Sequence, residues 1–348
     1  MKRLTRSLAL SAAAALSFGL AACGDDDESS PASGTTGSEA AELTVYSGRD
    51  EELVAPLFER FETETGTKLS VRYGDTAELA ATIREEGENS PADVFFGQDA
   101  GALGALDKDG LLAKLPAAAL DPVAQEFRSA NDTWVGTSGR ARVLAYDSRE
   151  LKEADLPASV LDLTGPEWKG KIGWAPTNAS FQAFVTALRK VEGDDVAEQW
   201  LKDMDANGAK AYEKNGLVRD AIANGEIQAG LINHYYVLDA ASSEGDDYPV
   251  KLHFFPGGDT GALVNVAGGG VLKSSEQQEA AASLLTFLLA DEQQKFFVDE
   301  TFEYPLAGDT AAPAGIPAID SIEQPDVDLA DLDDLAGTLE LIEKSGVL

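Results

Sequence analysis

Short apolar runs alternate with helical segments along the first part of the chain. Residues 43–47 form a short run rich in β-forming side chains, and 69–73 and 92–96 form two more. Between them, apolar residues recur at helical spacing in 50–66 and 76–87, and each segment ends in a glycine. The third run is continuously apolar in its second half, as buried parallel strands are. This alternation predicts a parallel α/β layer.

The same alternation returns in the second half of the chain. Strand-like runs lie at 143–146, 171–174 and 229–232, and amphipathic helices are expected around 181–191 and 276–290. A chain of 348 residues is long enough for two domains that each bury a core. We therefore expect an α/β fold with two lobes, each a mainly parallel sheet flanked by helices.

The N-terminus has the organisation of a secretory signal. A basic start is followed by an apolar run that is too short to span a membrane, and this run ends in LAAC at 20–23. The ending resembles the bacterial lipobox, in which the cysteine is lipid-modified, and Cys23 is the lone cysteine of the chain. We expect a lipoprotein signal peptide at 1–22 and a lipid anchor at Cys23; a buried structural cysteine is the alternative. Residues 23–41, acidic and then rich in Ser, Gly and Thr, are expected to form a flexible tether.

Composition excludes several functional classes. With 61 acidic against 27 basic residues and a net charge of −34, the chain has no electrostatic footprint for nucleic acid. Two histidines, one cysteine and the lack of a Gly-x-Ser-x-Gly motif argue against an enzyme, although a carboxylate-only glycosidase stays formally open. A secreted α/β protein of two domains with few catalytic groups is typical of solute-binding proteins, whose lobes close over a ligand.

Three tyrosines are candidate ligands for a metal ion. Tyr235 and Tyr236 follow a strand, where both phenol oxygens can converge if they lie in the first turn of a helix. Tyr146 lies in the strand that we expect to connect the lobes. Phenolates with an added anion suit a small, hard, highly charged cation such as ferric iron. The alternative is that the two adjacent rings only pack near a strand end.

Two segments are candidates for holding the anion. Arg140 and Arg142 can bind an anion with two parallel hydrogen bonds, or they are ordinary solvated or salt-bridged side chains. The segment 178–180 begins a helix, so its backbone N–H groups either cradle an anion or simply belong to a helix cap.

Several motifs resemble one family across residues 43–348. They are VYSGR at 45–49, PADVF at 91–95, SGR at 138–140 continuing to Tyr146, WKGK at 168–171, NGEI at 224–227, INHYY at 232–236 and FEYP at 302–305. With these motifs the chain resembles the bacterial periplasmic ferric-binding proteins, the substrate-binding components of iron(III) ABC transporters. The tyrosine pair after Ile-Asn is the most specific of these motifs, because a generic α/β binding protein does not need it.

The resemblance implies a type II-like periplasmic-binding-protein fold that carries Fe3+ to a transporter permease, as a monomer outside the cytoplasm. Tyr235 and Tyr236 would be paired phenolate ligands, with Tyr146 as a third. A synergistic anion (carbonate, phosphate or one resembling citrate) would be held by residues matching the family's anion loop: Asn178, Ala179, Ser180, Asn215 and Asn233. Arg140 or Arg142 would hold carbonate, as in some members.

The first lobe departs from the family pattern at two positions. Asp50 stands where many members have a histidine ligand, and it is either an oxygen donor or, as we favour, the cap of the helix that begins at Glu51. Gln98 stands where some members place a glutamate ligand, with Asp99 next; we expect both to be cleft contacts, and Gln98 to be a hydrogen-bond partner.

We expect lobe 1 to comprise residues 42–140 and 265–310, and lobe 2 residues 141–264 and 311–348. The competing hypothesis within the same fold is a binder of another small solute, such as a polyamine, an oxyanion or a phosphonate. The tyrosines argue against a polyamine, whose site needs several carboxylates with aromatic walls.

Overall fold

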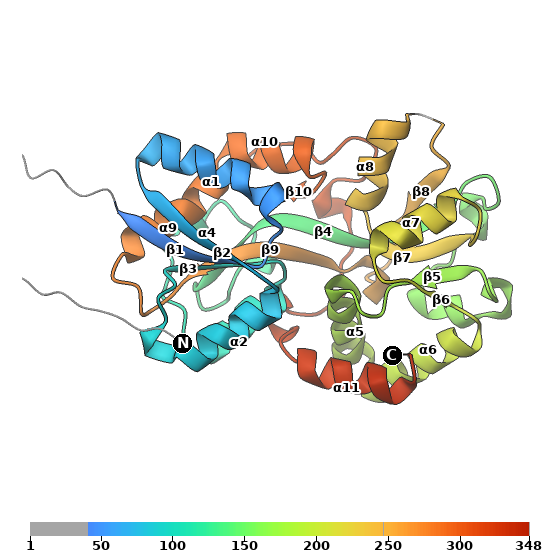
Figure 1. The fold of residues 1–348 in the computed structure, drawn as a ribbon. Coiled ribbons are helices and arrows are strands. Elements are labelled where there is room, and N and C mark those ends of the chain that lie inside the picture. Colours follow the sequence, from blue (N-terminus) through green and yellow to red (C-terminus); the bar gives the residue numbers. More distant parts are fainter. Residues whose placement is uncertain (1–40, 246, 348) are drawn as a thin grey trace, which may run out of the picture. The chain divides into compact units, whose positions relative to one another are not determined.

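A ten-stranded mixed sheet runs through the folded body, in the order β2-β1-β3-β9-β4-β7-β5-β6, with β8 and β10 also paired to β4. The computed structural model describes residues 41–245 and 247–347 (Figure 1). Strand β4 (Trp134–Asp147) divides the sheet, because its residues pair with β9 up to Ala141 and with β7 from Arg142 onward. We call the part on the β9 side lobe 1 and the part on the β7 side lobe 2.

Lobe 1 begins with the alternation expected from the sequence. Its strands are β1 (Glu42–Ser47), β2 (Lys68–Tyr73), β3 (Val94–Gly97), β9 (Val264–Val271) and β10 (Tyr304–Pro305), and its helices are α1 (Glu51–Thr65), α2 (Thr76–Glu86), α3 (Ala100–Lys108), α4 (Ala117–Leu120), α9 (Gln278–Leu288) and α10 (Asp291–Glu300). Helix α1 buries Leu57, Phe58 and Phe61, which lie on one helical face, and Gly66 ends it in the left-handed conformation with φ 76°.

Lobe 2 repeats the pattern around the other half of β4. Its strands are β5 (Ile172–Trp174), β6 (Lys210–Ala211), β7 (Ala229–Asn233) and β8 (Val250–His253), and its helices are α5 (Ala179–Glu192), α6 (Asp194–Ala206), α7 (Asn215–Ala223) and α8 (Tyr235–Glu244). Four aromatic side chains of lobe 2 pack against one another edge to face or tilted: Trp174 of β5, Phe181 and Phe184 of α5, and Trp200 of α6. The α/β fold class is confirmed.

The pairing between strands is more mixed than we expected. Strands β1, β2 and β3 are parallel, as are β5, β6 and β7, but β4 is antiparallel to each of β7, β8, β9 and β10. The long strands β4 and β9 lie side by side through the middle of Figure 1. Gly268 of β9 approaches β4 closely, since a Cβ there would overlap the carbonyl oxygen of Val135.

The C-terminal tail contacts both lobes, whereas we expected 311–348 to belong to lobe 2 alone. The short helix η8 (Leu329–Asp331) packs on α3 of lobe 1, and α11 (Leu335–Ser345) packs on α5 and α6 of lobe 2. The reason is that Gly101 and Gly104 of α3 have no side chain, which lets the tail backbone rest directly on this helix.

The signal peptide, Cys23 and nearly all of the tether lie outside the described residues. In the part that the structure describes, we find no helix that is long and apolar enough to cross a membrane.

Candidate ligand-binding site

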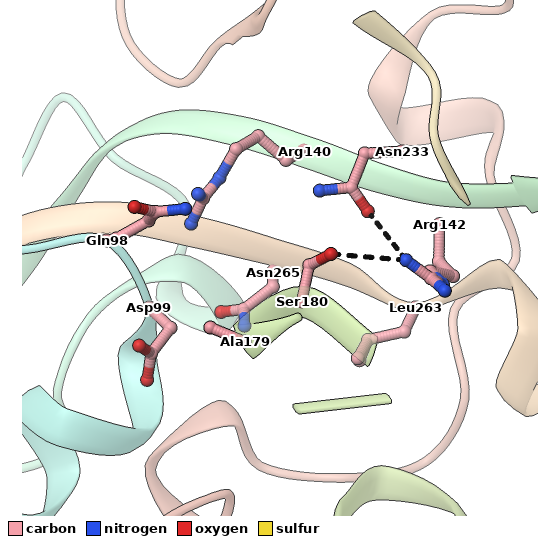
Figure 2. A pocket seen from close by; sticks show the side chains of 9 residues that line it. All are labelled: Gln98, Asp99, Arg140, Arg142, Ala179, Ser180, Asn233, Leu263 and Asn265. Carbon is pink, nitrogen blue, oxygen red and sulfur yellow. Dashed lines mark hydrogen bonds between the residues drawn. The ribbon is translucent and has the colours of Figure 1, made fainter. Parts of the chain in front are cut away.

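One small cavity brings together residues from both lobes (Figure 2). Its volume is about 20 Å³, and it is lined by Gln98, Asp99, Arg140, Arg142, Ala179, Ser180, Asn233, Leu263 and Asn265. Seven of these nine were candidates from the sequence. The two that sequence reasoning missed are Leu263 and Asn265, which flank the start of β9. No motif marks either of them, and only the pairing of β9 with β4 places them here.

Arg142 forms the lobe 2 wall of the cavity. Its guanidinium donates to Ser180 Oγ at 3.2 Å, to Asn233 Oδ1 at 3.4 Å and to the Leu231 carbonyl at 2.8 Å. Figure 2 shows Ser180 and Asn233 pointing toward it. The guanidinium also lies over the rings of Phe181 and Phe184. Burial lowers the pKa of Arg142 to about 9, so the group is cationic at neutral pH.

Asn178 and Asn215 do not line the cavity, but they position Ser180. Asn178 caps α5 by accepting from the Ser180 N–H at 3.0 Å, and it also accepts from Ser180 Oγ at 2.6 Å. Asn215 donates to Asn178 at 3.2 Å and to Ser180 Oγ at 2.9 Å. Asn178 is therefore a helix cap, and Ala179 and Ser180 line the cavity; that this segment holds an anion stays a prediction.

Arg140 is a buried cation that faces the cavity. It is 4% exposed, forms no ion pair within residues 41–245 and 247–347, and its Nε has no hydrogen-bond partner there. Burial, and then the nearby charge of Arg49, lower the pKa of Arg140. A buried guanidinium with unused donors is costly unless an anion satisfies it. The alternative of an ordinary solvated or salt-bridged side chain does not fit this residue.

Arg49 and Glu303, whose charges both act on the pKa of Arg140, form a buried ion pair. Arg49, directly after β1, donates to Glu303 at 2.9 Å, and Ser138 Oγ donates to the same carboxylate at 2.6 Å. Burial alone would raise the pKa of Glu303, but the charges of Arg49 and Arg140 outweigh it and hold the pKa below its ordinary value. Both residues lie in motifs that carried the family resemblance. Sequence reasoning still missed their pairing, because they are 254 positions apart.

The tyrosine pair begins α8, as expected. The rings of Tyr235 and Tyr236 lie 4.4 Å apart between centroids and only 31° from parallel, so both project from the first turn to the same side. Burial, and then neighbouring Tyr236, raise the pKa of Tyr235, while the charge of Arg140 acts against this rise. The phenol of Tyr235 is therefore neutral at neutral pH. The pair begins two residues after Asn233, which lines the cavity, but neither tyrosine lines the cavity itself.

Tyr146 lies apart from this group. It pairs with Ala229 and Lys251 in the sheet, four residues beyond Arg142 along β4, and the nearby charge that acts on its pKa is that of Glu153. Four strand residues span about 13 Å. We therefore leave Tyr146 out of the proposed ligand set.

Lobe 1 offers fewer groups to the site. Asp50 precedes α1 and is exposed, but its side chain makes no capping hydrogen bond to any described residue, so the structure does not bear out the cap that we favoured. Asp99 does cap α3, accepting from the Ala102 N–H at 3.0 Å, and burial raises its pKa. The half-buried Gln98 lines the cavity, and its backbone N–H donates to Thr76 Oγ1 at 3.1 Å.

The fold and the interlobe cavity define a solute-binding protein, and comparisons with known proteins agree. A family model of bacterial extracellular solute-binding proteins matches residues 89–329. The major ferric iron-binding protein of Neisseria meningitidis serogroup B is 36% identical over 315 residues, which cover 88% of this chain and 93% of that protein.

Two solved structures have the same fold. Iron-bound HitA from Pseudomonas aeruginosa is 35% identical with a TM-score of 0.81, and the match covers 88% of this chain and 99% of that one. The Trichodesmium protein IdiA (FutA), in complex with iron and citrate, is 28% identical with a TM-score of 0.74 and the same coverage. The chain belongs to the family of bacterial periplasmic ferric-iron-binding proteins, which are binding proteins and not enzymes.

Proposed function

We propose that this protein captures ferric iron outside the cytoplasm, together with a small anion, and delivers it to an ABC transporter permease. The observation that carries the proposal is the pair of phenols at the start of α8, stacked at 4.4 Å. The pair begins two residues after Asn233, which lines a cavity together with two buried arginines. The names of the relatives, which include iron-bound proteins, support the same ligand.

The charges fit a trivalent oxygen-seeking ion. Fe3+ prefers hard oxygen donors, and its charge favours phenolate over phenol at Tyr235 and Tyr236. Two phenolates offset two of its three positive charges, and an anion held by Arg140 and Arg142 supplies further oxygen donors and negative charge. Arg140 gains the partner that it otherwise lacks within the described part of the chain.

The cavity favours a small anion. A volume of about 20 Å³ is close to the space that one water molecule needs. Carbonate is the smallest of the three candidate anions and therefore needs the least movement of the cavity walls, whereas phosphate and a citrate-like anion need more. On the lobe 2 side, the guanidinium of Arg142 lines the cavity, and its Nε has no hydrogen-bond partner in the described part of the chain.

Lobe 1 then closes over a site that lobe 2 has already assembled. Asp50 is the exposed carboxylate that we propose as an additional oxygen donor, and Gln98 is a hydrogen-bond partner at the cavity. Lipidation at Cys23 would hold the protein at the membrane where its permease lies. The basic start, the apolar run and the LAAC ending of the sequence support this anchor.

An iron titration tests the proposal. Ferric citrate added to the purified protein is expected to produce a visible phenolate-to-iron absorption band and to raise the melting temperature. The double variant Tyr235→Phe with Tyr236→Phe is expected to lose both effects. Tyr146→Phe is the matched control, because it removes a hydroxyl from another half-buried tyrosine of lobe 2, and it should keep both. A colourless protein with no thermal shift would contradict the proposal.

A further inference from the structure

His234 sits between the two lobes, directly before the tyrosine pair. It follows β7 in lobe 2, is fully buried, and contacts Ala141 of β4 and Phe302 of lobe 1. We infer that His234 is a positioning residue that fixes the orientation of Tyr235 relative to both lobes. The inference rests on the proposed ferric site and deepens it, because it assigns a determinant of ligand geometry that makes no bond to the metal.

The hydrogen bonds of the imidazole define one tautomer. The Ala141 N–H donates to Nδ1 at 3.1 Å, so Nδ1 carries no proton. Nε2 lies 2.9 Å from the Phe302 carbonyl, which can only accept, so Nε2 carries the proton. Both ring nitrogens are thus occupied, and His234 has no free lone pair for a metal. Its role is to orient neighbouring groups.

One end of this link is attached where β4 changes partners. Ala141 is the last residue of β4 paired with β9, and Arg142 is the first paired with β7. The backbone N–H of His234 also donates to the Ala141 carbonyl at 3.0 Å. The backbone and the side chain of His234 therefore both hydrogen-bond to the same residue. The start of α8 is therefore fixed to the strand that crosses between the lobes.

The other end is attached to a strained corner of lobe 1. Phe302 has φ 55°, in the left-handed region that non-glycine residues seldom adopt. The next residue, Glu303, holds Arg49 and Ser138. This corner therefore contacts His234 through the Phe302 carbonyl and Arg49 through the carboxylate of Glu303. A shift of the corner would move His234 and this buried ion pair together.

The ring of His234 also packs against the ligand tyrosine. Its centroid lies 5.8 Å from that of Tyr235 at an interplanar angle of 84°, and 4.8 Å from that of Tyr304 on the opposite lobe at 39°. Tyr235 is therefore held between Tyr236 and His234. A side chain without a ring would leave Tyr235 free to tilt away from the metal.

The test compares the two histidines of the chain. His234→Gln keeps a donor near the Nε2 position but loses the ring, and His234→Asn keeps an acceptor near Nδ1. His253→Gln is the control. His253 is half-buried and its Nε2 bonds to one carbonyl, that of Pro157 at 2.8 Å, but it lies on β8 and not beside the tyrosine pair. We expect both His234 variants to shift the visible iron band and to release iron to excess citrate at least about tenfold faster, and the control to match the unmodified protein.

The outcomes separate this inference from the proposed function. If the unmodified protein has no iron band, the proposed function fails and the inference fails with it. If the band is present, and a folded His234→Gln keeps both its position and the unmodified release rate, only the inference is overturned. If neither variant folds, ¹⁵N-histidine NMR of the unmodified protein decides. The ring of His234 must show an unprotonated Nδ1 and a protonated Nε2, and its ¹⁵N chemical shifts must change when the protein is loaded with diamagnetic gallium(III). Unchanged shifts on loading would overturn the inference.

Discussion

The two walls of the proposed site are built in different ways. On lobe 2, Arg142, Ser180, Asn178, Asn215 and Asn233 are hydrogen-bonded to one another, and the tyrosine pair is already stacked. On lobe 1, the cavity is lined by Gln98, Asp99, Arg140 and Asn265, which form no hydrogen bonds with one another in the described part of the chain. Arg140 has no ion pair there, whereas Arg49 is paired with Glu303 in the interior. The difference indicates that the lobe 2 wall is already ordered by its own hydrogen bonds, and that the lobe 1 wall is not.

The largest expected effect comes from the interior pair of lobe 1. Glu303→Gln leaves Arg49 without a buried counter-charge, so we expect the free energy of unfolding to fall by roughly 3 kcal/mol at pH 7. Because the pKa of Glu303 lies below its ordinary value of 4.5, its stabilisation is present above that value and is lost as the pH falls below it. Urea unfolding at several pH values should show the two proteins converging under acid.

The control for this prediction is Glu300→Gln, which alters an exposed carboxylate on neighbouring α10. It should follow the unmodified protein at every pH. A constant difference between Glu303→Gln and the unmodified protein down to pH 3 would contradict the assigned ion pair.

On lobe 2, the corresponding test removes the central guanidinium. Arg142→Ala strips hydrogen bonds from Ser180, Asn233 and the Leu231 carbonyl, and we expect it to cost about 3 kcal/mol of stability. It should also abolish any thermal stabilisation by carbonate or phosphate. Gln98→Ala, on the lobe 1 wall, should cost less than about 0.5 kcal/mol. Equal effects of the two substitutions in urea and thermal-shift measurements would remove the contrast between the walls.

The tail that contacts both lobes gives an intermediate effect. In Gly104→Ala the new Cβ overlaps the Ala330 carbonyl, so the tail must lift from α3, and we expect a loss of about 1–3 kcal/mol. Gly216→Ala is the matched control, since Gly216 is also helical but has open space around it. The control should gain up to about 1 kcal/mol from helix propensity. A gain in both variants would mean that the tail does not rest on α3 in solution.

The smallest effect is expected at Asp50. Because its side chain caps nothing in the described part of the chain, Asp50→Ala should change stability by less than about 0.5 kcal/mol. Iron affinity should still fall, by about tenfold, if the carboxylate joins the metal on closure. Competition with citrate measures this, with Glu51→Ala as the neighbouring control. Unchanged affinity would leave lobe 1 without a metal ligand at this position.

How far the sequence predicts the molecule depends on the range of the interaction. The local alternation of strands and helices and the helix start at Tyr235 follow from short-range patterns. Residue chemistry and the family resemblance together marked seven of the nine cavity residues. The distance of Tyr146 from Arg142 could not be predicted, because a strand pattern does not say how far along the strand the cleft lies. The Arg49–Glu303 pair and the tail on α3 depend on packing between segments far apart in sequence, which periodicity does not encode.

Anomalous diffraction at the iron absorption edge, from crystals of the iron-loaded protein, tests the central claim most directly. The account predicts one strong peak bonded to the phenol oxygens of Tyr235 and Tyr236, with an anion between the peak and Arg140. A peak bonded to the carboxylates at 50–52 and to neither tyrosine, or iron bound elsewhere without either tyrosine, would contradict it.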